Sequence, residues 1–199
     1  MSARLLNYLI SGKYIIGAIL ISLISPLSYA DTPTQDVHVQ VDHQDTVFHV
    51  TAHMEVPVPQ SIAWLVLTDF THFSTFLHNV KHVNVVSQQG NRYRIHEVGE
   101  AEWGIISMEY QNIRDITLEP QYRITSNTIS GTVKSMHTEM RLTNSNTDNV
   151  ILDYQASIEP DSWLADIFGS DFIDSEVKEQ FQSMAREMIK RYHGAPTQP

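Results

Sequence analysis

The sequence predicts an α+β fold in which a curved antiparallel sheet of six to seven strands wraps around one long C-terminal helix. Three observations predict it. Apolar residues alternate strictly from Phe48 to Val56, six further strand-like segments follow in close succession from residue 80, and an apolar stripe of helical period lies near the C-terminus. Because the connections between the six later segments are too short for a crossover helix, the strands should form an antiparallel meander.

The first strand and two short helices after it are encoded between residues 46 and 77. One face of the strand is apolar and the other is polar, which is typical of a half-buried strand. Pro59 can begin the first helix, since its missing N–H costs nothing in a first turn. In that helix Ile62, Leu65 and Val66 are expected to share the apolar face. The second short helix is expected through Phe73, Phe76 and Leu77.

Turn signals separate the six later strands. Gly90 lies in a Gln-Gln-Gly-Asn turn of hairpin type, and an Asn/Asp-rich turn covers residues 144–149. The strands are therefore expected at residues 80–87, 91–100, 104–116, 122–128, 132–143 and 150–158.

The C-terminal helix is indicated by apolar residues that recur every three or four positions. They are Ile173, Val177, Phe181, Met184, Met188 and Tyr192. Acidic residues at the start of this segment and Lys190 and Arg191 at its end both favour the helix dipole. The pattern therefore predicts one long amphipathic helix in this segment.

The first 30 residues resemble a signal peptide. Arg4 and Lys13 give the segment a basic start, and an apolar core follows from Tyr14 to Ile24. After Pro26, Ser28 and Ala30 place small residues at the two positions that a signal peptidase reads. The apolar run is shorter than the ~20 residues of a membrane span, so cleavage near Ala30 is expected. The alternative is retention as an anchor. The mature protein should then be exported, to the periplasm or outside the cell, with no stable membrane anchor.

The rest of the chain is expected to be one domain. Residues 31–45 form a polar leader or an edge strand, in which the alternation of Val37, Val39 and Val41 could pair with the next strand. The domain itself is expected at residues 46–192, with a flexible tail at 193–199.

The charge balance argues against a nucleic-acid partner. The chain has 13 basic and 23 acidic side chains, a formal charge of −10. Removal of Arg4 and Lys13 leaves 11 basic side chains, and 11 − 23 gives −12 for the mature protein. Such a charge repels phosphate backbones. The absence of cysteine excludes disulfides and a lipoprotein acyl anchor.

The order of several motifs resembles the START/Bet v 1-like (SRPBCC) superfamily, and within it the exported polyketide-cyclase or coenzyme-Q-binding type. The resemblance extends from about Val47 to Arg191. Its motifs are Pro57-Val58-Pro59 followed by Trp64 to Phe70 and by Phe73 and Phe76, then Glu97 to Ala101, Ile129-Ser130-Gly131, and the tail from Gln180 to Arg191. Relatives often carry Gln where Glu97 stands here.

The resemblance implies a helix-grip fold with a cavity between the sheet and the C-terminal helix. The expected function is binding or carriage of an apolar or amphipathic small molecule, such as a lipid, a quinone or a polyketide-like compound, without a cofactor. Flexible methionines and aromatic rings suit such a wall. The expected lining is Phe73, Phe76, Leu77, Tyr93, Trp103, Met108, Tyr110, Met136, Met140, Phe181, Met184 and Met188.

An enzyme is the first alternative, as a cyclase, dehydratase or hydrolase that uses one interior carboxylate or histidine. Glu97 is the weak catalytic candidate, and Glu109 or Glu139 could also be interior. No nucleophile with a positioned base is evident, so no catalytic residue is assigned. The ten histidines lack metal-site spacing. They are interpreted as solvated surface residues, and no metal is expected.

A protein-interaction module of the cell envelope is the second alternative. It would use the acidic surface, or the edge formed by residues 37–41, to hold a protein partner that the sequence does not identify.

Overall fold

The computed structural model describes residues 35–103, 106–146, 148–161 and 169–194. The predicted signal peptide and the end of the predicted tail lie outside these residues. The described elements are β1 (His38–Gln44), β2 (Val47–Val56), α1 (Gln60–Leu67), the 3₁₀ helix η1 (Phe70–Thr75), β3 (Val80–Gln89), β4 (Arg92–Trp103), β5 (Ile106–Glu119), β6 (Arg123–Gly131), β7 (Val133–Asn146), β8 (Asn149–Pro160) and α2 (Ser170–Gly194).

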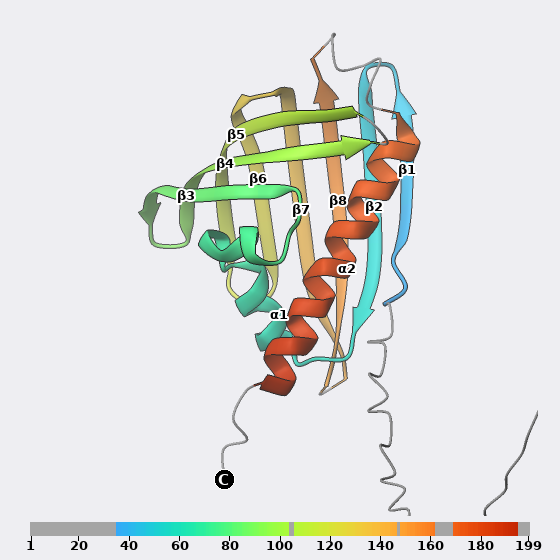
Figure 1. The fold of residues 1–199 in the computed structure, drawn as a ribbon. Coiled ribbons are helices and arrows are strands. Elements are labelled where there is room, and N and C mark those ends of the chain that lie inside the picture. The colour runs from blue at the N-terminus through green and yellow to red at the C-terminus, as the bar shows by residue number, and fades with distance from the viewer. Residues whose placement is uncertain (1–34, 104–105, 147, 162–168, 195–199) are drawn as a thin grey trace, which may run out of the picture. The chain divides into compact units, whose positions relative to one another are not determined.

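The strands form a single antiparallel sheet in the order β1-β2-β8-β7-β6-β5-β4-β3. Strands β3 to β8 are the expected meander, and α2 packs against β1, β2 and α1. Figure 1 shows α2 crossing one face of the curved sheet. The predicted α+β helix-grip architecture is therefore confirmed.

The sheet has eight strands rather than six to seven, because the segment before residue 46 is an ordered strand. Strand β1 pairs with β2 over its whole length, with His38 opposite His53 and Gln44 opposite Val47. Asp45 forms the turn with φ of 55°. Of the two alternatives for this segment, the edge strand is the one observed.

The core follows the alternation of the strands. On β2 the side chains of Phe48, Val50, Ala52, Met54 and Val56 are all buried, whereas those between them are exposed or partly exposed. The buried set faces α2, where Phe181, Met184 and Met188 are also buried. Burial of these faces is the main stabilising contribution, at roughly 25 cal/mol per Å² of apolar surface.

The expected apolar face of α1 was wrong at one position. The buried residues of α1 are Ala63, Val66 and Leu67, and Leu65 is 58% exposed. A helix of eight residues presents only about two turns, so that a small rotation moves a residue from the core to the surface. Among the described residues, no helix is long and apolar enough to span a membrane.

Gly99 allows a close approach that shapes the interior. A Cβ atom at this position of β4 would collide with the backbone oxygen of Asn79 and with the ring of Tyr110. Because these atoms come from β3's start and from β5, any larger residue would force the three strands apart. The glycine thus lets the Tyr110 ring approach β4 closely and its hydroxyl donate to Asn79 O at 3.1 Å.

Candidate functional site: a cavity between the sheet and α2

The face of the sheet that α2 covers encloses, together with that helix, a cavity of about 280 Å³. Its wall comes from α1, η1, strands β3 to β8 and α2. Most of the wall is apolar, because the inward positions of β5 and β7 carry Met108, Ile116, Met136 and Met140. The elements brought together are far apart in sequence, which is why no single motif encodes the cavity.

Eight of the residues expected from the sequence line this cavity. They are Phe73, Leu77, Met108, Tyr110, Met136, Met140, Phe181 and Met184. The catalytic candidate Glu97 also lies in the wall and is 7% exposed. The other two carboxylates are not interior: Glu109 is exposed and pairs with Lys81, and Glu139 pairs with Arg123 and Arg141.

Three expected lining residues lie elsewhere in the structure. Phe76 packs on Phe73 and lies beneath the guanidinium of Arg191, 5.8 Å from the ring centre. Tyr93 contacts Phe70 edge-on, and its hydroxyl accepts a hydrogen bond from Gln88. Met188 is fully buried in the apolar core. The side chain of Trp103, the fourth remaining candidate, lies outside the described part of the structure.

The arginine that pairs with Glu97 inside the cavity was not expected from the sequence. Arg114 donates from Nη2 to the Glu97 carboxylate at 2.5 Å, and both side chains are largely buried. Burial raises the pKa of Tyr110 strongly, with the Glu97 charge adding to the effect, so the phenol stays a neutral donor. Burial likewise raises the pKa of Tyr154 to about 12.

Four buried polar atoms of the cavity wall have no hydrogen-bond partner among the described residues. They are Oδ1 of Asn79, Oδ1 of Asn112, Nε of Arg114 and Oγ of Ser126, and all four residues line the cavity. A buried polar atom without a partner costs about 1–3 kcal/mol. The cavity therefore offers unused donors and acceptors to a ligand.

The missed residues share one sequence signal. Met108, Tyr110, Asn112, Arg114 and Ile116 alternate along β5 and all line the cavity. Extending the alternation from the two residues that were predicted would have reached Asn112 and Arg114. A buried arginine breaks the apolar pattern, which is why composition alone did not reveal it.

Larger depressions on the opposite face of the sheet have a different character. One of them, of about 440 Å³, lies over β1, β2, β7 and β8 and is lined by exposed polar side chains such as His53 and Asp153. A ligand there would remain in contact with water, so little apolar surface would be buried. The inner cavity is the better site for an apolar molecule.

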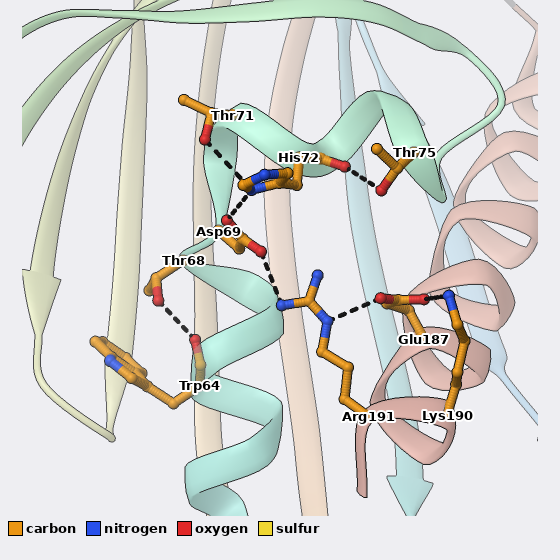
Figure 2. Close-up of polar contacts among 9 residues, drawn as sticks. All are labelled: Trp64, Thr68, Asp69, Thr71, His72, Thr75, Glu187, Lys190 and Arg191. Carbon is orange, nitrogen blue, oxygen red and sulfur yellow. Dashed lines mark hydrogen bonds and ion pairs between the residues drawn. The ribbon is translucent and has the colours of Figure 1, made fainter. Parts of the chain in front are cut away.

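One end of α2 is joined to the cavity wall by an ionic cluster, shown in Figure 2. Arg191 donates to Asp69 Oδ2 and to Glu187 Oε1, each at 2.8 Å, and His72 lies 2.6 Å from Asp69 Oδ1. We call these four residues the Asp69 clasp. It attaches η1, which contributes Phe70 and Phe73 to the wall, to the last turns of α2.

The clasp should make stability depend on acid pH. Burial works against ionisation of Asp69, but its hydrogen bonds and charge contacts with His72 and Arg191 hold its pKa below the ordinary value of 3.8. A carboxyl with a lowered native pKa stabilises the fold above its unfolded-state pKa, and this contribution is lost as the pH falls through the native pKa.

Asp69→Asn should lower the free energy of unfolding by about 1 kcal/mol at neutral pH. The difference from the parent should vanish as the pH falls from about 5 to about 2. Urea unfolding followed by tryptophan fluorescence measures both. Asp153→Asn is the matched control, since Asp153 accepts from His53 on the exposed outer face and should matter less. A deficit that stays constant with pH would contradict this role.

The fold and the lined cavity define a class of protein that encloses small hydrophobic molecules. Residues 56–185 match the family described as polyketide cyclase/dehydrase and lipid transport, and the chain belongs to this family. This places it in the SRPBCC or polyketide cyclase–START superfamily expected from the sequence. The family indicates a hydrophobic small-molecule ligand.

Solved structures with the same fold come from bacteria and humans. The Zhui aromatase/cyclase of a Streptomyces species superposes with a TM-score of 0.61 at 13% identity, covering 80% of this chain and 99% of the other. A STAR-related lipid transfer protein of Xanthomonas axonopodis gives 0.60 at 11%, covering 80% and 96%. Human STARD10 gives 0.59 at 12%, covering 82% and 78%. Curated protein sequences give no significant match.

Proposed function

We propose that this protein binds and carries an apolar or amphipathic small molecule in the cavity between the sheet and α2. One observation carries the proposal: an apolar cavity whose interior also holds buried polar atoms that find no partner within the described ranges of the chain. In a core that serves only to stabilise the fold, this combination would be unfavourable, because buried polar groups without a hydrogen bond lower the stability of the folded state. A ligand with a polar end would supply the missing partners.

The size of the cavity favours a compact ligand. Small-molecule sites usually have volumes of about 300–1,000 Å³, and this one has about 280 Å³. A single acyl chain or a small ring system therefore fits the site better than a lipid with two long chains. Each Å² of apolar ligand surface that is buried contributes roughly 25 cal/mol.

The polar atoms indicate the chemistry of the ligand head. Nε of Arg114 is a donor, whereas the free oxygens of Asn79 and Asn112 are acceptors. A head with a carbonyl or carboxylate oxygen next to a hydroxyl would satisfy both kinds. Hydroxylated quinones and polyketide-like compounds carry both kinds of group, and a fatty acid does so in its protonated form, in which the carboxyl group has one O–H donor and one carbonyl acceptor. Among them we favour a single-chain fatty acid on grounds of size.

We further propose that the protein acts after export, in the periplasm or outside the cell. The support is the sequence pattern of residues 1–30, which places a basic start, an apolar core and small residues in the order of a cleavable signal. A carrier in that compartment would move apolar compounds through water.

Native mass spectrometry of the protein, purified without detergent or denaturant, tests the binding proposal. We expect adducts with the mass of a single-chain lipid that disappear after extraction with organic solvent and are recovered in the extract. Protein that carries no adduct and also fails to take up fatty acids or quinones from solution would overturn the proposal. That outcome would favour the interaction-module alternative.

A further inference from the structure

A group of three potential metal ligands lies where the start of β3 meets α2. His78 precedes β3, and Glu176 and Glu179 lie one turn apart on α2. One ligand atom from each of the three side chains lies within 4.8 Å of the other two. The group therefore combines a nitrogen and two oxygen donors from segments about 100 residues apart.

The distances suit a small divalent ion. Bonds of about 2.0–2.2 Å in a tetrahedral site place neighbouring ligand atoms roughly 3.3–3.6 Å apart. His78 Nδ1 and Glu179 Oε1 already lie 3.4 Å apart. Both side chains are about half exposed, so their rotamers are free to bring the remaining atoms closer.

Glu176 is held in place from inside the protein. Asn79 Nδ2 donates to Glu176 Oε2 at 3.1 Å, and Asn79 is only 3% exposed. Carboxylates that bind metals are commonly oriented by such an outer hydrogen bond. The same amide has an Oδ1 atom that is buried and, within the described residues, lacks a partner.

Acidic side chains predominate around this group. Glu179 and Glu102 oppose ionisation of the Glu176 carboxyl, whereas His78 favours it. Across the part of the chain that the structure describes, no lysine or arginine forms an ion pair with any of the three glutamates. Like charges at this distance repel one another, and a divalent cation would remove the repulsion.

We propose that His78, Glu176 and Glu179 form a binding site for a divalent transition-metal ion such as Zn²⁺. One imidazole and two carboxylates suit Zn²⁺, which in catalytic sites takes three protein ligands and keeps a fourth position open. His78 is exposed, as the sequence-based interpretation expected, and the proposal gives it a role as a metal ligand in addition. The site needs no spacing motif, because the ligands meet only in the folded chain.

The site would lie beside the cavity, since Glu176 belongs to both. An oxygen atom of a bound ligand could then occupy the open position of the ion. This last step rests on the proposed function, whereas metal binding itself does not. A titration with metal alone keeps the two apart.

Isothermal titration of the purified, untagged protein with Zn²⁺, and absorption spectroscopy with Co²⁺, test the site. We expect one ion per chain, at least tenfold weaker binding in His78→Ala and in Glu179→Gln, and no saturable binding in the double variant. Both residues are exposed, so these variants should fold. A cobalt spectrum should show tetrahedral or five-coordinate nitrogen and oxygen ligation.

Matched controls separate this site from the other histidines of the surface. His82→Ala and Glu109→Gln remove an exposed histidine and an exposed glutamate that contact Asn84 and Lys81 instead. Both should bind Zn²⁺ within about twofold of the parent. Equal binding by the parent and the double variant, or no stoichiometric binding by the parent, would overturn the proposal whatever the lipid experiments show.

Discussion

Met140→Glu should weaken the binding of a fluorescent fatty acid at least 100-fold. Met140 lies on β7 with its side chain in the cavity wall, and the residue is only 8% exposed. A carboxyl group at this position must stay ionised in an apolar space, at a cost of several kcal/mol, take up a proton against its ordinary pKa, or draw water into the cavity. About 2.8 kcal/mol is enough for a factor of 100 in Kd.

Two control variants show whether the effect belongs to the cavity. Met140→Leu keeps the site apolar and should change Kd by less than about fivefold. Leu65→Glu adds the same charge at a position that is 58% exposed on α1, and should leave Kd unchanged. Circular dichroism confirms that each variant is folded. Unaltered fatty-acid binding by folded Met140→Glu protein would place the ligand elsewhere.

Arg114→Ala should lower the free energy of unfolding by about 3–5 kcal/mol. The variant leaves the Glu97 carboxylate inside the protein without its counter-ion, and Glu97 is 7% exposed. The cost arises from the unpaired charge rather than from the lost attraction. Urea unfolding monitored by tryptophan fluorescence gives the difference directly.

The same pair of strands supplies a matched control. Arg94 of β4 pairs with Asp115 of β5 on the outer face, where both side chains are more than 40% exposed. Arg94→Ala should therefore cost only about 0–1 kcal/mol. Replacing Glu97 and Arg114 together by leucine should recover much of the loss. If Arg114→Ala costs no more than Arg94→Ala, the inner pair is not a buried ion pair in solution.

The fold was predictable because its signals are local and periodic. The alternation of β2 and the stripe of α2 each assign their own buried face, and short turns exclude crossover connections. Whether residues 31–45 form a strand depended on their pairing with β2. The short alternating run at Val37, Val39 and Val41 did not decide this, so a polar leader and an edge strand both remained possible. The helices, the strands and most of the core were thus predictable from local sequence patterns.

The cavity was only partly predictable, because its wall depends on how far each side chain reaches. Tyr93 shares a strand with Glu97, yet it lies at the far end, against Phe70. Met188 is one turn beyond Met184 on α2 and enters the solid core instead. Arg114 was missed because an arginine in a strand is usually solvent-exposed, and its burial follows from pairing with Glu97 on the next strand.

The segment from Asp69 to Asn79 is fastened to α2 at both of its ends. Asp69 accepts a hydrogen bond from Arg191, and Asn79 donates one to Glu176. These two positions of the helix are about 22 Å apart along its axis. Any widening of the gap between this segment and the helix must release one fastening while the other serves as the pivot. The contact that gives way first would therefore decide the end of the cavity at which a ligand enters.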